Sequence, residues 1–157
     1  MQKLDYFAAA PDAMKAWLAA STRINATLDP MLVKLVEVRA SQINGCANCI
    51  NMHVAHAREN GETAQRLHLL AAWRDAPCYT DRERAALAWT EAMTRLCDGT
   101  RAHEDAYPAL EAEFTEAERA QLTLVINVIN GWNRLSVGFG SWIEPEAAKA
   151  LQARGGA

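Results

Sequence analysis

The pattern of apolar and polar positions along the chain is typical of helices. Valine, isoleucine and threonine do not accumulate in alternating runs, and alanine, leucine, glutamate and arginine dominate. Residues that cap or break helices punctuate this pattern. We therefore expect an all-α protein, with helices over about 11–27, 30–44, 46–60, 63–76, 80–98, 102–114 and 115–137.

Cap residues define the ends of several of these predicted helices. Thr80 with Glu83, and Thr115 with Glu118, have the spacing of a capping box, in which each partner satisfies a free backbone N–H of the first helical turn. The tail should form at most a short helix, beginning near Pro145. Because no low-complexity linker interrupts the chain, we expect one compact domain over residues 1–157.

The predicted helix over residues 121–137 is apolar around most of its circumference. A helix of this kind is either central to the core or shared with another subunit. For a chain of 157 residues, an oligomer interface that contributes part of the burial is an open alternative to a purely internal position.

Composition narrows the classes of protein to consider. Half of the residues are hydrophobic and the net charge is only −3, which gives no electrostatic footprint for nucleic acid. The first residues lack the pattern of a secretory signal, and no apolar run reaches the ~20 residues of a membrane-spanning helix. We expect a cytoplasmic protein without membrane or nucleic-acid partners. In a reducing compartment, a C-x-x-C pair indicates metal or redox chemistry more often than a structural disulfide.

The segment SQINGCANCINMH carries the most informative motif, in which Cys46, Cys49 and His53 follow the spacing C-x-x-C-x-x-x-H. Residues three and four apart lie on one face of a helix. Both cysteines fall at the start of a predicted helix, where free N–H groups and the helix dipole favour a thiolate. The His53 imidazole lies one turn further and is suited to accept a thiol proton near neutral pH. The motif therefore predicts a redox-active dithiol with its own base.

The motif has three other interpretations: a zinc site, the active site of a thioredoxin fold, and a packed core. Adding His56 produces a zinc-like set, but Cys46 to His56 spans about 15 Å of helix, whereas zinc ligands converge on one point at about 2.0–2.3 Å. We therefore expect no metal, and His56 to be a supporting or surface residue. A thioredoxin fold would need a strand before the motif, where LVKLVEVRASQI fits a helix. Simple packing of two buried cysteines and a core histidine is the remaining alternative.

The same segment resembles the core of the alkylhydroperoxidase AhpD-like proteins, in the carboxymuconolactone decarboxylase superfamily. The resemblance continues through GETAQRLHLLAAWRDAP, RERAALAWTEAMTRL and TLVINVINGWNRLSVGF, and covers about residues 30–140. It implies an all-α fold that assembles into homotrimers or homohexamers. It also implies a peroxidase in which Cys49 is the peroxidatic thiol, Cys46 the resolving thiol and His53 part of a proton relay.

The chain departs from the family pattern at the relay carboxylate. Better-studied members have a glutamate twelve residues before the first cysteine, and this position is Lys34 here. Glu37 is the nearest carboxylate, about one turn along the same helix and rotated by about 60° around it. We expect Glu37 to complete the relay, with two alternatives: Lys34 lowers the thiol pKa directly, or Glu37 is only a partner for Arg39 or another surface cation.

The sequence thus predicts a thiol-dependent peroxidase that reduces hydroperoxides through a Cys46–Cys49 dithiol–disulfide cycle, in an antioxidant role. An external dithiol of the lipoyl or thioredoxin type would restore the reduced state. No nucleotide fingerprint occurs, so we expect no NAD or flavin cofactor. The alternatives are a non-enzymatic redox-sensing or interaction protein, and a decarboxylase of the carboxymuconolactone type.

Overall fold

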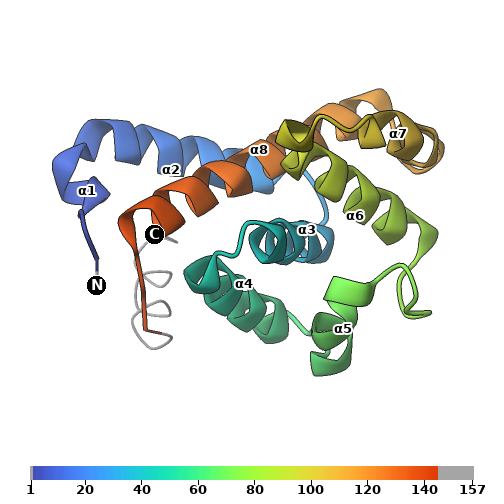
Figure 1. Cartoon of the computed structure of the whole chain (residues 1–157), viewed down its shortest axis with the longest axis horizontal. Coiled ribbons are helices and arrows are strands. Elements are labelled where there is room, and N and C mark those ends of the chain that lie inside the picture. The colour runs from blue at the N-terminus through green and yellow to red at the C-terminus, as the bar shows by residue number, and fades with distance from the viewer. Residues whose placement is uncertain (1, 145–157) are drawn as a thin grey trace.

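The computed structural model describes residues 2–144, and within that range it contains helices and no β-strand (Figure 1). The α-helices are α1 (Tyr6–Ala9), α2 (Pro11–Asn25), α3 (Pro30–Ile43), α4 (Ala47–Glu59), α5 (Ala64–Leu69), α6 (Asp81–Thr94), α7 (Ala102–Glu113) and α8 (Glu116–Phe139). Single turns of 3₁₀ helix cover Leu70–Ala72 and Leu96–Asp98. The predicted all-α fold class is therefore confirmed.

Most predicted helix ends agree with the structure to within a few residues. Both capping boxes form: each threonine accepts from the N3 backbone, and each glutamate accepts from the cap residue. The main error lies after α5, where a continuous helix was expected to about residue 76. There the chain turns so that Trp73, Ala76 and Tyr79 can pack with Leu35 and Val38 of α3, and this burial outweighs local helix propensity. The short helix expected near Pro145 lies outside the described residues.

Helix α3 lies at the centre of the molecule, with α4, α6 and α8 packed around it (Figure 1). Its residues Leu35, Val36 and Val38 have no exposed surface. Val36 joins a cluster formed with α6, α7 and α8, whereas Leu35 and Val38 face the cluster around Trp73. Because α3 packs against three other helices, it is a rigid support for the side chains that it places in the interior.

Helix α8 is the long apolar helix of the sequence, but it is not buried all round. Leu122, Val125 and Ile129 are in the core, while Leu124 and Val137 are exposed at two positions about 140° apart around the helix. Its inward face also carries polar residues near its C-terminal half: Asn130, Asn133 and Ser136. None of the helices in residues 2–144 is long and apolar enough to cross a membrane.

Candidate active site

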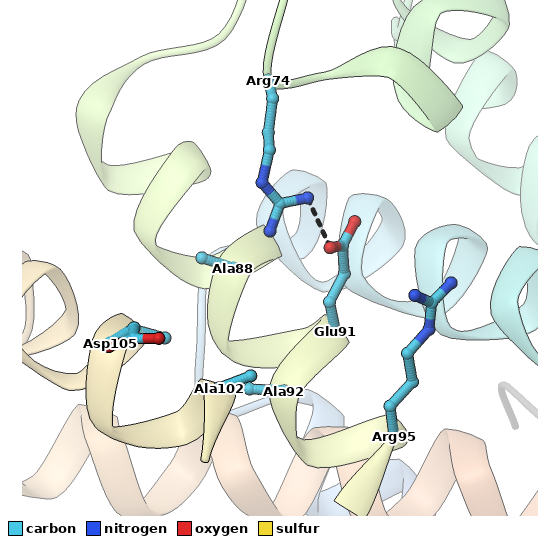
Figure 2. Close-up of a pocket in the computed structure, with 8 residues that line it drawn as sticks. Arg74, Ala88, Glu91, Ala92, Arg95, Ala102 and Asp105 are labelled. Atoms are coloured by element: carbon cyan, nitrogen blue, oxygen red, sulfur yellow. Dashed lines mark hydrogen bonds and ion pairs between the residues drawn. The ribbon is translucent and has the colours of Figure 1, made fainter. Parts of the chain in front are cut away.

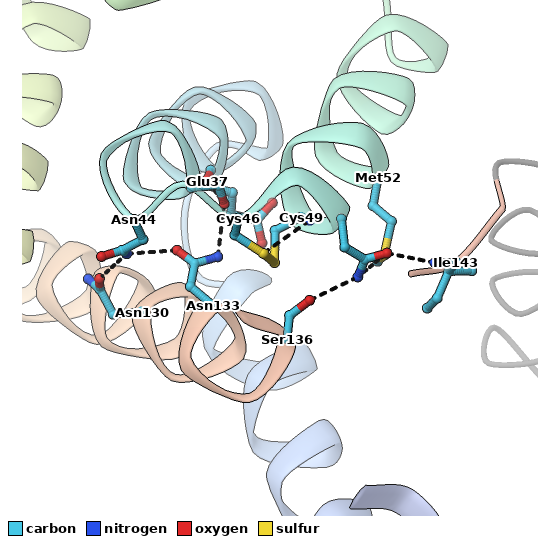
Figure 3. Close-up of a disulfide and its surroundings, with 11 residues drawn as sticks. Glu37, Asn44, Cys46, Cys49, Met52, Asn130, Asn133, Ser136 and Ile143 are labelled. Carbon is cyan, nitrogen blue, oxygen red and sulfur yellow. Dashed lines mark hydrogen bonds between the residues drawn. A yellow bond between two sulfur atoms is a disulfide. The ribbon is translucent and has the colours of Figure 1, made fainter. Parts of the chain in front are cut away.

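The two motif cysteines lie at the N-terminus of α4 and form a disulfide (Figure 3). Gly45, with φ of +65°, makes the left-handed turn between α3 and α4, a conformation that glycine adopts without steric cost. Cys46 is the N-cap residue, and its Sγ accepts a hydrogen bond from the Cys49 N–H at 3.3 Å. The Cα atoms of the pair are 5.4 Å apart. A backbone donor therefore points at one of the two sulfur atoms.

The cysteine pair is almost covered by protein. Cys46 is 1% exposed and Cys49 is 5% exposed. The chain has two further cysteines, and both are unpaired: Cys78 is half-buried and Cys97 is exposed. Of the four cysteines in the chain, the two that form a disulfide are therefore those of the motif.

Asparagines of α8 hold the turn that precedes the disulfide. The Asn44 side-chain amide donates to Asn130 Oδ1 at 2.7 Å and to Asn133 Oδ1 at 2.8 Å, and Figure 3 shows it between them. Asn133 in turn donates to Ser41 Oγ at 3.0 Å. The sequence analysis missed this network. Its signal was Asn130 and Asn133, three residues apart in the segment VINGWN.

Asn48, between the two cysteines, connects the start of α4 to the end of the described chain. Its side-chain amide donates to Ser136 Oγ at 3.3 Å, and its Oδ1 accepts from the Ile143 backbone N–H at 2.8 Å (Figure 3). The side chain therefore ties the first turn of α4 both to α8 and to the segment after it.

The carboxylate of Glu37, on α3, lies beside His53, on α4. Glu37 is 3% exposed, and its Oε2 lies 3.0 Å from Nδ1 of His53. The same oxygen accepts from Lys34 Nζ at 2.7 Å, while Oε1 accepts from the Asn25 amide at 2.8 Å. Glu37 does not pair with Arg39, but it does pair with the partly exposed Lys34, so the alternative of a partner for a surface cation was wrong only in naming Arg39. The Asn25 contact comes from α2 and was not predicted.

Arg39 instead pairs with the carboxylate of Glu91, on α6. The distance from Arg39 Nη2 to Glu91 Oε1 is 2.8 Å, and the indole N–H of Trp73 donates to the same oxygen at 2.8 Å. Arg74 binds the other carboxylate oxygen. This buried ion pair joins α3, α6 and the turn after α5.

Charge and burial act in opposite directions on the Glu37 carboxyl. Burial alone would raise its pKa, but the charges of His53 and Lys34 and their hydrogen bonds outweigh burial and lower the pKa to about 2. For His56, burial lowers the pKa, and the positive charges of His53 and Lys34 add to that effect. Glu37 is therefore ionised at neutral pH, and the neutral form of His56 is favoured.

His56 is buried, which corrects the expectation that it could lie on the surface. Its ring meets the ring of His53 edge to face, with centroids 6.0 Å apart. Within residues 2–144, no group of three or more histidine, cysteine or acidic side chains is placed to hold a metal ion. The chemistry that these residues offer is therefore that of a dithiol with an adjacent imidazole and carboxylate.

A surface hollow of about 380 Å³ lies between α6 and α7. Alanines form much of its lining, and Arg74 reaches across to Glu91 at its edge (Figure 2). None of the predicted site residues lines this hollow. It is therefore separate from the dithiol site.

Comparisons with known proteins agree with this fold. Residues 11–92 match the carboxymuconolactone decarboxylase family. The chain is 37% identical over 145 residues to the uncharacterized protein YdfG of Bacillus subtilis (strain 168), covering 89% of this chain and 95% of YdfG. A solved structure from Agrobacterium tumefaciens, of a protein of unknown function considered a candidate antioxidant defence protein AhpD, superposes with a TM-score of 0.87. It is 39% identical and covers 92% of this chain and 99% of its own.

A peroxidase-related protein from Silicibacter sp. TM1040 has the same fold, with a TM-score of 0.78 at 22% identity, over 91% of this chain and 76% of its own. At that identity the likeness concerns the fold alone. The family match covers more than half of the chain, and the YdfG alignment extends over nearly all of it. The chain therefore belongs to the carboxymuconolactone decarboxylase family and has an AhpD-like structure.

Proposed function

We propose that this protein is a thiol-dependent peroxidase that reduces hydroperoxides through Cys46 and Cys49, in an antioxidant role. The observation that carries the proposal is the Cys46–Cys49 disulfide at the start of α4, together with the contact between His53 of the same helix and Glu37 of α3. The carboxymuconolactone decarboxylase reaction is a weaker candidate, because lactone or decarboxylation chemistry does not need paired cysteines.

The first step oxidises Cys49. Its thiolate attacks the outer oxygen of a hydroperoxide, the O–O bond breaks, and the alkoxide leaves as an alcohol after it takes up a proton. The product at Cys49 is a sulfenic acid. The small exposed fraction of Cys49 favours a slim reacting group such as a terminal peroxide over a bulky electrophile.

The second step closes the disulfide. The Cys46 sulfur attacks the sulfenic acid, and water leaves as the S–S bond forms. An external dithiol of the lipoyl or thioredoxin type then attacks Cys49, and Cys46 departs as a thiolate. The Cys49 N–H, 3.3 Å from the Cys46 sulfur, would stabilise that departing anion.

His53 is the proton carrier in this scheme. It lies one helical turn beyond Cys49, and its Nδ1 faces the ionised Glu37 carboxylate. A carboxylate at Nδ1 keeps the proton on that nitrogen and leaves Nε2 free to accept one. His53 can then take the Cys49 proton and return it to the leaving alkoxide.

We further propose that the protein works in the cytoplasm as a homotrimer or homohexamer. The support for an oligomer is the membership of the carboxymuconolactone decarboxylase family and the resemblance to AhpD-like proteins. The oligomeric state is measurable by sedimentation.

Peroxide consumption with dihydrolipoamide or dithiothreitol tests the proposed reaction. We expect Cys46→Ser and Cys49→Ser to abolish catalytic turnover, and the matched variant with Cys78→Ser and Cys97→Ser to retain it. Mass spectrometry after peroxide treatment should detect a Cys46–Cys49 crosslink in the wild type, and a sulfenic acid at Cys49 in Cys46→Ser. Disulfide formation without turnover would indicate the redox-sensing alternative, and turnover that survives Cys49→Ser would refute the proposal.

A further inference from the structure

The Glu37 carboxylate has more than one cationic neighbour, and this arrangement determines how His53 behaves. Oε2 of Glu37 lies 2.7 Å from Lys34 Nζ and 3.0 Å from His53 Nδ1. Lys34 is on the same helix, one turn before Glu37, and its side chain is 20% exposed. Asn25 donates to the second oxygen from α2. Besides the His53 imidazole, each oxygen of the Glu37 carboxylate therefore has a hydrogen-bond donor: Lys34 on Oε2 and Asn25 on Oε1.

We propose that Lys34 is a positioning residue whose ammonium compensates the charge of the Glu37 carboxylate, so that this compensation does not require a second proton on the His53 ring. This inference rests on the proposed role of His53 as the proton carrier. Lys34 acts through Glu37 and does not contact the cysteines in the proposed reaction.

A buried carboxylate requires a compensating charge, and two groups here can supply it. A lysine ammonium carries its charge throughout the neutral range, whereas an imidazole gains and loses its charge within that range. While Lys34 is in place, Glu37 is compensated without a proton on His53. Without Lys34, the imidazole would be the remaining cation next to the carboxylate, and it would hold a second proton to higher pH.

The titratable and charged groups around His53 are few in the part of the chain that the structure describes. Helix α3 contributes Lys34 and Glu37, while α4 contributes His56 and, further along, Glu59. In the reduced protein the start of α4 also contributes the titratable thiols of Cys46 and Cys49, in wild type and variants alike. The group that α2 brings to Glu37, the side-chain amide of Asn25, is neutral. Lys34 is thus the permanent positive charge in contact with Glu37.

Nuclear magnetic resonance titration of the His53 ring in the reduced full-length protein tests this inference without any peroxide. We expect Lys34→Met and Lys34→Gln to move the titration midpoint of His53 upward by about one pH unit. Lys34→Arg, which keeps the charge, should restore the wild-type midpoint. The exposed lysine of α2 provides a matched control, and Lys15→Met should leave the midpoint unchanged. Using two neutral variants keeps the test valid if either folds poorly.

The pH dependence of peroxide turnover provides a second measurement. In Lys34→Met, the acid limb of the rate profile should move to higher pH by the same amount, because a protonated imidazole cannot act as the base. An unchanged or lowered midpoint in both neutral variants overturns the role of Lys34, as does failure of Lys34→Arg to restore it. If the midpoint moves as expected but the protein has no peroxide turnover, the proposed function fails while the charge relation stands.

Discussion

The ionised, buried Glu37 should make the stability of this protein depend on pH in a measurable way. Its folded-state pKa is about 2, compared with 4.5 for an unperturbed glutamate. A difference of that size corresponds to about 3 kcal/mol of stability when the group is ionised in both states. Because the folded-state pKa is the lower one, this stability is present above about pH 4.5 and is lost as the pH falls towards about 2.

The perturbation that isolates this contribution is Glu37→Gln, which keeps the shape and removes the titration. Between about pH 5 and about pH 3, the linkage relation gives a loss of about 2 kcal/mol from Glu37 in the wild type. The histidines are present in both proteins, so the comparison of wild type with Glu37→Gln subtracts the part of their contribution that does not depend on Glu37. The stability advantage of the wild type over Glu37→Gln should therefore shrink by about 2 kcal/mol across this pH range.

Urea unfolding monitored by circular dichroism measures this difference, at one fixed protein concentration so that any subunit association is constant. Glu116→Gln is the matched control, because the Glu116 side chain is 97% exposed and its removal should leave the pH dependence nearly unchanged. A gap between wild type and Glu37→Gln that stays constant from about pH 5 to about pH 3 would refute the account of Glu37 as a stabilised buried anion.

Two further predictions concern packing and charge elsewhere. A Cβ at Gly131 would lie 2.7 Å from the Trp17 ring, so Gly131→Ala should destabilise the folded protein by about 1–3 kcal/mol. A Cβ at Gly138, on the same helix, would meet open space, so Gly138→Ala should stabilise the folded protein by up to about 1 kcal/mol. Glu91→Ala would leave the mostly buried Arg39 without its carboxylate, and we expect a loss of about 3 kcal/mol. Urea unfolding measures all three variants; stabilisation by Gly131→Ala, or a loss well under about 1 kcal/mol for Glu91→Ala, would contradict these assignments.

Local sequence signals predicted the helices and part of the candidate site. Capping boxes depend on residues three apart, so Thr80 and Thr115 identified their helix starts from sequence alone. The same geometric rule placed Cys46, Cys49 and His53 on one face of one helix. The family resemblance indicated a carboxylate near Lys34, and helix geometry identified Glu37 as the nearest one. Glu37 does contact His53, although its part in a relay stays a prediction.

Contacts between distant helices could not be predicted in this way. Asn25 reaches Glu37 from α2, and Asn133 reaches Ser41 from α8, a sequence separation of 92 residues. No spacing rule relates such pairs, because they depend on how the helices cross. The preference of Arg39 for Glu91 over Glu37 has the same origin, since the partner is 52 residues away on α6.

The hydrogen bonds around the disulfide favour the proposed catalytic cycle over the alternative of a redox sensor that changes conformation. The Cα atoms of Cys46 and Cys49 are 5.4 Å apart, within the range of about 4.4–6.8 Å that a disulfide needs, and the helix geometry of the first turn of α4 sets this separation. Asn48, between the cysteines, is hydrogen-bonded to Ser136 and Ile143, and these bonds resist unwinding of that turn.

A redox sensor needs contacts that differ between its two states. We expect reduction of this pair to require only rotation of the two cysteine side chains, which would permit repeated opening and closing of the bond without a change of fold. We therefore expect backbone amide signals of the oxidised and reduced protein to differ only near α4, and widespread differences reaching α6 and α7 would favour the sensor instead.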